Sequence, residues 1–239
     1  ENEFTIAIVG GGPASVELAF AAQFRIHQEL QLKTTEKSLL NIKIISADQE
    51  LLSLHNSKVR SFAKIELVRR NIEVILESSV SEFEENKVVC ENGNTYLANK
   101  VIYATGASIP AWPGECGLAL TENGFIEVNS HLQSTSHEFV FAAGDAADIR
   151  GQQRPKSGVY AVRQGPPLAK NLVRYATGKP LTRYKPQQHA LALLSMGNKS
   201  AIASHNNFFF KGRSVWSIKH NIDTSFIKKY SDLPEMNAQ

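Results

Sequence analysis

The chain has 239 residues, of which 42% are hydrophobic and 21% charged, with a net charge of +3; this composition is typical of a globular protein large enough to bury a core. No apolar run approaches the length of a membrane span, and the acidic N-terminal residues do not have the pattern of a signal peptide. The two cysteines, Cys90 and Cys116, have no metal or redox spacing, which excludes a dithiol centre and favours a reducing, cytoplasmic location.

A glycine-rich loop lies between the first predicted strand and the first predicted helix. The apolar run 4–9 ends in three glycines, and an apolar helical pattern follows from about Ala14 to about Leu30. Gly10 allows a tight turn, and Gly12 lets the backbone approach a pyrophosphate at the positive end of the helix dipole. Ser15 stands where a third small residue packs helix against strand. The pattern predicts a dinucleotide site; the alternative is a plain strand-to-helix turn. The candidate binding residues are Gly10, Gly11, Gly12, Pro13, Ala14 and Ser15.

The end of the second predicted strand, 42–46, is the place where such sites select their cofactor. An acid there binds the ribose 2′-hydroxyl of NAD, whereas basic groups suit NADP. The strand ends in Ser46-Ala-Asp48, and a polar insertion at 31–40 lengthens the usual spacing. We expect NAD, with NADP not excluded, and Ser46 and Asp48 as candidate ligands. Asp48 fits a turn-capping aspartate equally well.

The following elements continue an α/β pattern. An amphipathic helix is predicted over 56–70, with Asn56 or Ser57 as its N-cap, and a strand over 72–76. Short alternating stretches between 80 and 97, with an Asn-Gly signal in 91–94, predict an antiparallel β-meander. A strand over 100–106 then ends in an Ala-Thr-Gly turn.

A connector rich in proline and glycine precedes the second part of the chain. Strands are predicted at 124–128 and 137–145, the second buried and ending in Gly144-Asp145, where a carboxylate can accept from sugar hydroxyls. A helix is expected to follow through about Ala176, with Pro166-Pro167 forcing a kink or a break into two helices. Strands at 188–195, 200–204 and 207–210 and a helix over 214–230 complete the pattern.

Charge is distributed unevenly along the sequence. Residues 1–150 contain 12 Lys/Arg against 20 Asp/Glu, a net charge of −8, whereas residues 151–239 contain 14 against 3, a net charge of +11. The basic part could face phosphates, anionic lipid or an acidic neighbour, or be a merely solvated surface. Aromatic residues and lysines in 208–230 fit a peripheral contact with the inner face of a membrane; the alternative is a helix packed on its own domain. No nucleic-acid partner is predicted.

Four motifs, in order, resemble one known family. They are Gly10-Gly-Gly-Pro-Ala-Ser-Val-Glu17, Ala104-Thr-Gly106, Phe141-Ala-Ala-Gly-Asp-Ala146 and Pro155-Lys-Ser-Gly158. Over nearly the whole chain they resemble the FAD-dependent pyridine nucleotide-disulfide oxidoreductase superfamily, in particular its NADH dehydrogenase-like members. The stretches 160–169 and 190–195 look like the subgroup associated with selenide, water dikinase, which makes such a domain an expected partner. Residues 155–158 also resemble sulfide:quinone reductases and flavocytochrome c sulfide dehydrogenases.

The resemblance implies an architecture. The order of the motifs implies that 10–15 is the NAD(P) loop and that the N-terminal FAD loop is absent, so the chain looks like a fragment. A Rossmann-like, three-layer ββα NAD(P)-binding domain with a β-meander is implied at 1–107. The returning half of the FAD-binding domain is implied at 108–150, and a flavin-edge helix with a small α+β C-terminal interface region at 151–239.

The resemblance also implies roles for single residues. Glu17 would face the flavin–nicotinamide junction, Asp145 would bind the FAD ribityl chain, and Lys156 would lie beside the flavin pyrimidine edge. A cation and helix-end N–H groups there would stabilise a reduced, anionic flavin. The remaining cofactor-binding residues that it implies are Thr105, Gly106, Gly144, Gly158, Val159 and Tyr160.

The expected function is that of an FAD- and NAD(P)-dependent oxidoreductase without a metal. Hydride would pass from nicotinamide to flavin, and electrons to a quinone, a disulfide or another small-molecule acceptor, with Glu17 and Lys156 as candidate catalytic residues. A sulfide- or selenium-linked flavoprotein reductase is the first alternative, although Cys90 and Cys116 are poorly placed for it. The second alternative is an isolated nucleotide-binding fragment without activity.

Overall fold

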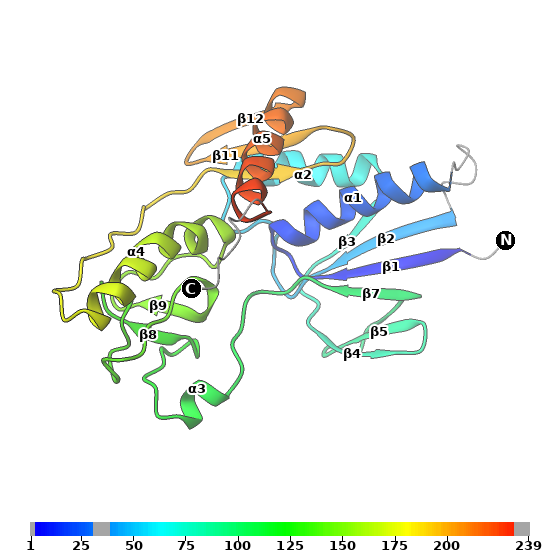
Figure 1. Ribbon diagram of the computed structural model, residues 1–239. Coiled ribbons are helices and arrows are strands. Elements are labelled where there is room, and N and C mark those ends of the chain that lie inside the picture. Colours follow the sequence, from blue (N-terminus) through cyan, green and yellow to red (C-terminus); the bar gives the residue numbers. More distant parts are fainter. Residues whose placement is uncertain (1–2, 31–38, 232–239) are drawn as a thin grey trace. The chain divides into compact units, whose positions relative to one another are not determined.

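The computed structural model describes residues 3–30 and 39–231, so most of the polar insertion at 31–40 lies outside the described residues. The chain divides into two compact units (Figure 1). Unit 1 comprises Glu1–Thr105 with Leu191–Gln239, and unit 2 comprises Gly106–Ala190. The first division lies close to the expected boundary at 107, whereas the region expected as one piece over 151–239 is shared between the two units.

Unit 1 is built on a four-stranded parallel sheet in the order β3-β2-β1-β7. Its strands are β1 (Phe4–Val9), β2 (Leu40–Ile45), β3 (Ile72–Ile75) and β7 (Lys100–Tyr103), with helices α1 (Pro13–Glu29) and α2 (Ser57–Arg69) between them. The fold class is therefore α/β and Rossmann-like, as the sequence predicts. The expected N-cap of the second helix is confirmed, because the Asn56 side chain accepts from the Val59 N–H at 3.1 Å.

The core of unit 1 explains why β1 reads as one apolar run. Five of its six residues are buried, as in a parallel strand that is covered on both faces. On α1, Val16, Ala19 and Phe20 recur at helical spacing and pack against this sheet within one hydrophobic cluster.

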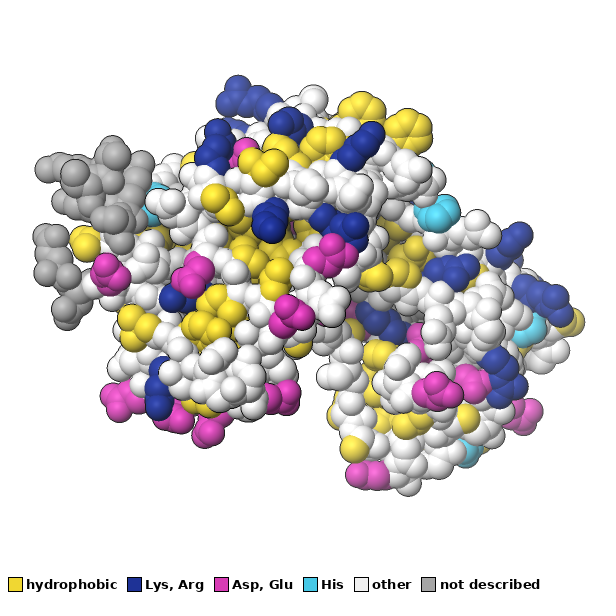
Figure 2. Space-filling view, turned by 180° about the vertical axis from the view of Figure 1, so that it is seen from behind, with side chains coloured by type: hydrophobic (Ala, Val, Ile, Leu, Met, Phe, Trp, Pro, Cys, Tyr) yellow, Lys and Arg dark blue, Asp and Glu magenta, His cyan; other side chains and the backbone are white. Residues whose placement is uncertain are grey.

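The meander forms the second sheet of unit 1. Its strands are β4 (Val80–Glu84), β5 (Lys87–Cys90) and β6 (Thr95–Leu97), all antiparallel as predicted. Gly93 adopts a φ of +82° in the predicted Asn-Gly turn, a conformation that favours glycine. Figure 2 shows acidic side chains over this region, where Glu82, Glu84 and Glu91 are exposed.

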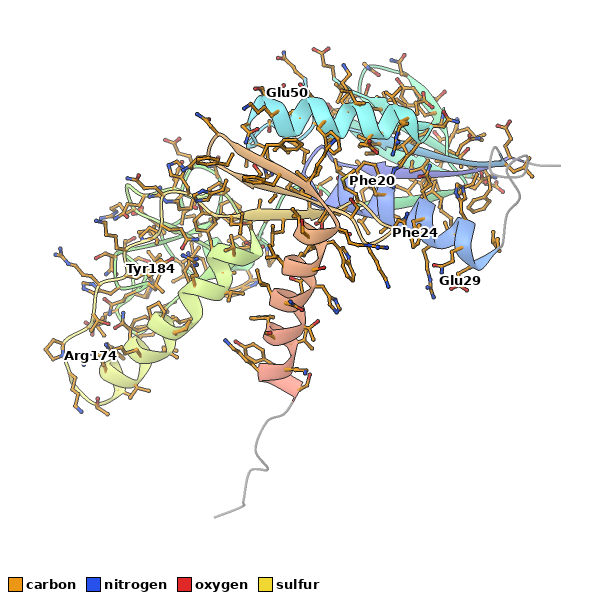
Figure 3. The ribbon with its side chains drawn as sticks, turned by 90° about the horizontal axis from the view of Figure 1, so that it is seen from above. Phe20, Phe24, Glu29, Glu50, Arg174 and Tyr184 are labelled. Carbon is orange, nitrogen blue, oxygen red and sulfur yellow. The ribbon has the colours of Figure 1, made fainter. Side chains whose placement is uncertain are left out.

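The C-terminal sheet also belongs to unit 1. It has the order β10-β11-β12, with β10 (Ala192–Ser195), β11 (Ala201–His205) and β12 (Phe208–Gly212), and is followed by α5 (Arg213–Ser231). Arg70 fixes it to the helices: its guanidinium donates to the Met196 carbonyl at 2.7 Å and lies 4.7 Å from the centre of the Phe20 ring (Figure 3). Leu194 and Ile202 belong to the same hydrophobic cluster as β1 and α1, so this sheet shares the main core of unit 1.

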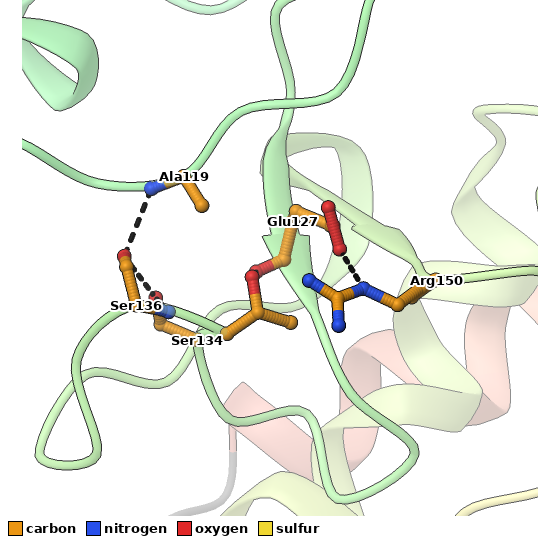
Figure 4. Close-up of polar contacts among 6 residues, drawn as sticks. Ala119, Glu127, Ser134, Ser136 and Arg150 are labelled. Atoms are coloured by element: carbon orange, nitrogen blue, oxygen red, sulfur yellow. Dashed lines mark hydrogen bonds and ion pairs between the residues drawn. The ribbon is translucent and has the colours of Figure 1, made fainter.

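Unit 2 contains few regular elements. They are α3 (Trp112–Glu115), the parallel strands β8 (Ile126–Val128) and β9 (Ala147–Ile149), the 3₁₀ turn η2 (Gly144–Ala146) and α4 (Gly158–Ala176). Polar contacts hold its loops in place: Ser136 accepts from the Ala119 N–H at 2.9 Å, and Arg150 pairs with Glu127 (Figure 4).

One expectation for this unit is wrong, and one of two alternatives is excluded. The buried strand predicted over 137–145 is not formed: Phe139 is 67% exposed, and among the described residues this segment pairs through a single bridge, Phe141 with Gln133. Its neighbour, residues 132–134, makes backbone hydrogen bonds with it only through Val140 and Ala142 among the described residues, which is too short a pairing for a ladder, and Gly144 leaves the extended region with a φ of +66°. Of the two outcomes expected at prolines 166 and 167, the break into two helices does not occur, because α4 is continuous through both. The carbonyls that lose an N–H partner belong to exposed residues, Val162 and Arg163, where water can satisfy them.

Candidate functional site

Two glycines of the loop in unit 1 are packed against neighbouring atoms, and the third is not. A Cβ on Gly10 would lie 2.3 Å from the Ala104 carbonyl oxygen, and the φ of this residue is +131°. A Cβ on Gly11 would lie 2.4 Å from Ser46 Oγ and 2.6 Å from an oxygen of Asp48, whereas one on Gly12 would meet no atom within 4 Å. The first two glycines therefore let the loop pack on the sheet, and the third faces open space.

Ser15 fills the space between helix and strand. It is fully buried, and its Oγ donates to the Ala104 carbonyl at 3.3 Å. This is the packing position that the sequence assigns to a third small residue. The same Ala104 carbonyl limits Gly10, so both ends of the loop contact the chain just after β7.

Ser46 and Asp48 lie together at the carboxyl end of β2. Ser46 Oγ is 3.1 Å from Asp48 Oδ2 and also accepts from the Asp48 N–H at 3.1 Å. Ser46 is buried, and Asp48 is exposed beside Gly11. The insertion at 31–40 therefore does not displace Asp48 from the loop, and an exposed carboxylate here can accept from vicinal hydroxyl groups.

The first turn of α1 is suited to an anion. Within the described residues it has Gly12 as N-cap, Pro13 as first residue, no side-chain cap and no acid. Backbone N–H groups at an uncapped helix N-terminus attract phosphate. The open space at Gly12, this uncapped turn and the Asp48 carboxylate together fit the pyrophosphate and ribose of a dinucleotide.

Glu17 has protein partners within unit 1. Its carboxylate accepts from the Ser195 N–H at 2.6 Å, and Lys219 Nζ lies 3.7 Å away. Both partners come from the C-terminal part of unit 1, β10 and α5, and no local sequence signal indicates either contact. The expected role of Glu17 at a flavin–nicotinamide junction stays a prediction.

The Ala-Thr-Gly turn lies at the boundary between the units. Thr105 and Gly106 are both exposed, and a Cβ on Gly106 would meet no atom within 4 Å. Their backbone is therefore accessible to a ligand, as cofactor binding requires.

In unit 2, Gly144 and Asp145 line a pocket at the start of β9. Gly144 donates its N–H to Gln164 Oε1 at 2.5 Å, and a Cβ on it would lie 3.2 Å from Ala161. Asp145 is exposed, and its carboxylate has no protein partner among the described residues. This carboxylate precedes a strand, whereas the sequence placed it after one. It is still available to sugar hydroxyls.

Lys156 is more strongly engaged than the sequence suggests. Its ammonium donates to the Ala147 carbonyl at 2.6 Å and to Asp148 Oδ1 at 2.8 Å, and it lies 3.8 Å from the centre of the Phe125 ring. Thr121 donates to the other oxygen of Asp148 at 3.2 Å. The sequence patterns did not single out Asp148, although it is the only acidic residue between positions 146 and 190.

The N-terminus of α4 lies next in sequence to Lys156 and Tyr160, which line the same pocket. Within the described residues its N-cap Ser157 makes no side-chain cap and its first turn holds no acid. Gly158 has open space where a Cβ would lie, and Tyr160 is buried in the pocket lining. Free N–H groups of Gly158 and Val159 can therefore interact with an electron-rich edge of a ligand.

The remaining titratable groups give little sign of redox chemistry. Both cysteines are free thiols; Cys116 is exposed, and burial raises the pKa of the Cys90 thiol.

Among residues 3–30 and 39–231, no cluster of His, Cys, Asp and Glu side chains could hold a metal ion. No helix of these residues has the length and hydropathy to cross a bilayer.

Comparisons with known proteins identify relatives. A family model described as "Pyridine nucleotide-disulphide oxidoreductase" matches residues 1–165. The chain is 31% identical to "Ferroptosis suppressor protein 1" of Taeniopygia guttata, over 96% of this chain and 60% of that protein. It is 27% identical to "Type II NADH:quinone oxidoreductase" of Haemophilus influenzae, over 88% of this chain and 49% of that protein.

A solved structure supports the fold. It is an engineered water-forming NADPH oxidase bound to NADPH, with a TM-score of 0.64 and 19% identity over 84% of this chain and 42% of that one. The chain thus spans about two fifths to three fifths of the length of these proteins.

Proposed function

Since the chain belongs to the pyridine nucleotide-disulphide oxidoreductase family, we propose that it is part of an NAD(P)H-dependent flavoprotein oxidoreductase. Unit 1 binds the nicotinamide dinucleotide, and unit 2 contributes to the flavin site. When bound, the flavin accepts a hydride from reduced nicotinamide and passes electrons on. The observation that carries the proposal is the glycine loop, in which Gly10 and Gly11 are closed by the sheet and Gly12 is open.

The residues of unit 1 bind and orient the dinucleotide. The N–H groups of the first turn of α1 hold the pyrophosphate, with Pro13 removing a donor that would otherwise need a partner. Asp48 accepts from the ribose hydroxyls of the adenosine, which favours NADH over NADPH because a 2′-phosphate would meet a carboxylate. Glu17, held by Ser195 and Lys219, positions a carboxylate one turn into the helix.

The residues of unit 2 suit the flavin. Asp145 accepts from the ribityl hydroxyls, and the N–H groups of Gly158 and Val159 donate to the pyrimidine edge. Lys156 acts with them as a cation at this edge, although its charge is shared with Asp148. These N–H groups and this cation would stabilise negative charge at the edge of a bound flavin.

A quinone is the acceptor that the relatives favour. The Haemophilus influenzae relative is named an NADH:quinone oxidoreductase, and a Synechocystis relative is named a demethylphylloquinone reductase. Peripheral membrane contact through 208–230 fits such an acceptor: Phe208, Phe210, Ile222 and Tyr230 are all more than half exposed, and lysines lie among them.

The narrower expectations stay proposals. A selenide, water dikinase domain as partner rests on the resemblance of 160–169 and 190–195 alone. A sulfur-linked reaction has no support from the cysteines, because Cys90 is buried and neither cysteine has a disulfide partner among the described residues.

Titration of the chain with NADH and with NADPH, followed by nucleotide fluorescence, tests the dinucleotide site. We expect NADH to bind more tightly than NADPH, and Asp48→Ala to reduce that difference. No binding of either nucleotide at millimolar concentration would contradict the proposal. For the flavin, the visible spectrum of the whole protein should show a flavin band that NADH bleaches and that an added quinone restores.

A further inference from the structure

A second cluster of polar groups lies in unit 2, on α4 and on the segment that follows it. Residues 177–190, here called the strap, contain no helix or strand. The strap is held in place by Asn171, which exchanges hydrogen bonds with Thr182 at 2.9 Å, and by the Tyr184 N–H, which donates to the Ser130 carbonyl at 2.7 Å. These contacts hold in place the segment that contains Tyr184 and Gln187. Tyr184 is labelled in Figure 3.

Two arginines converge on Gln187. Arg154 Nε donates to its backbone carbonyl at 3.0 Å, and an Arg163 guanidinium nitrogen donates to its side-chain Oε1 at 2.5 Å. Both acceptors of Gln187 are thus used by cations. Its Nε2 is buried and has no hydrogen-bond partner among the described residues, and the same is true of Tyr184 Oη.

The cluster has many donors and few acceptors. The charges of Arg163 and Arg154 both act on the Tyr184 hydroxyl, whose pKa is raised chiefly by burial. Residues 151–190 contain eight Lys/Arg and no Asp or Glu. Of the nearby acids, Asp148 is paired with Lys156, and Asp145 lines the adjoining pocket. Buried donors without acceptors are costly, and guanidinium groups bind oxyanions in a bidentate manner.

We propose that Arg154, Arg163, Tyr184 and Gln187 form a binding site for an oxyanion, a phosphate or carboxylate group. Gln187 Nε2 and Tyr184 Oη donate from the buried side, and the two guanidinium groups close the site from the exposed side. Arg154 also lines the adjoining pocket that contains Asp145, whereas Arg163, Tyr184 and Gln187 do not, so the variants of these three residues test the site apart from the flavin assignment.

Thermal unfolding of the 239-residue chain tests the site. Its Tm is measured in sodium phosphate, sodium acetate and sodium chloride at equal ionic strength. An anion at about ten times its Kd should raise Tm by about 3–5 °C over chloride. An increment in phosphate identifies a phosphate ligand and an increment in acetate a carboxylate ligand, and either result supports the site.

Variants assign the effect to this cluster. Phosphate also stabilises proteins by exclusion from their surface and could bind at α1, so the increment must fall by at least half in Arg163→Gln. It must persist in Lys170→Gln, which removes the same charge from an exposed position of the same helix. Tyr184→Phe and Gln187→Leu are milder and should also reduce it. An equal increment in Arg163→Gln, or no increment over chloride in the unaltered chain, overturns the proposal.

Discussion

Glu17, in the second turn of α1, and Ser195, at the end of β10, are joined by a 2.6 Å hydrogen bond across 178 positions of sequence. The bond connects the helix that begins at the glycine loop to the C-terminal sheet. Lys219 on α5 adds a second, longer contact to the same carboxylate. The residue that the family resemblance points to as catalytic is thus also a link between two parts of unit 1.

Glu17→Ala should destabilise unit 1 by about 1–3 kcal/mol, because the Ser195 N–H loses a charged acceptor. Glu17→Gln retains an acceptor oxygen and should cost less than half as much. Urea unfolding measures both. If both variants unfold at the wild-type midpoint, the hydrogen bond does not contribute to stability, and Glu17 would have to be explained by activity alone.

The glycine loop offers a matched pair of substitutions. Gly10→Ala should lower the unfolding free energy by about 4 kcal/mol or more, since its Cβ would lie 2.3 Å from a backbone oxygen at a φ of +131°.

Gly12→Ala should change stability by less than about 1 kcal/mol, because residue 12 has an ordinary φ of −82° and open space around its Cβ. It should weaken NADH binding at least tenfold by occupying the space of the pyrophosphate. Fluorescence titration and circular dichroism separate the two effects; unaltered NADH affinity in this variant would contradict the proposed site.

Lys156 and Asp148 form a poorly exposed pair, with side-chain exposures of 17% and 6%. Lys156→Met should therefore destabilise unit 2 by about 3–5 kcal/mol, since it leaves a buried carboxylate without its cation. The double variant Lys156→Met with Asp148→Leu should recover most of that loss. Lys179→Met, at an exposed position of the strap, is the control and should have little effect. Calorimetry follows all three.

His55 predicts a pH dependence. Its Nδ1 is 3.1 Å from Ser204 Oγ, and burial lowers its pKa from the ordinary value of 6.5. The imidazole of the unfolded chain then binds a proton more readily than that of the folded chain. The contribution of His55 to the free energy of unfolding should therefore be fully present above about pH 6.5 and should decrease as the pH falls towards the lowered pKa. His55→Gln should remove this part of the decline, whereas exposed His205→Gln should not. Tm measured from pH 8 to 5 gives the test.

Local patterns were sufficient for most of the fold. The apolar run before Gly10, the Asn56 cap and the Asn-Gly turn of the meander each act over a few residues, and each is formed as predicted. The strand predicted over 137–145 is wrong for a different reason: its apolar residues have the right composition, but its neighbour, residues 132–134, is too short to pair with the whole segment, and composition does not report this.

The candidate site also contains features that the local sequence predicts and features that it does not. The positions of Gly10, Gly12 and Ser15 follow from backbone requirements that are visible in the sequence. The partners of Glu17 and Lys156 do not, because they depend on which distant elements pack together. Asp148 lies within a short apolar strand and gives no local signal that it will pair with a lysine.

The late position of the C-terminal sheet in the sequence affects the order in which the two units can fold during synthesis. Leu194, Met196 and Ile202 belong to the same hydrophobic cluster as Ile8 and Phe20, yet the ribosome delivers them only after the whole of unit 2. Until then the nascent β1–α2 segment presents an apolar surface without its cover. Chaperone engagement is therefore expected to last until about residue 212 has emerged, and unit 2, whose core is continuous in sequence, can fold first.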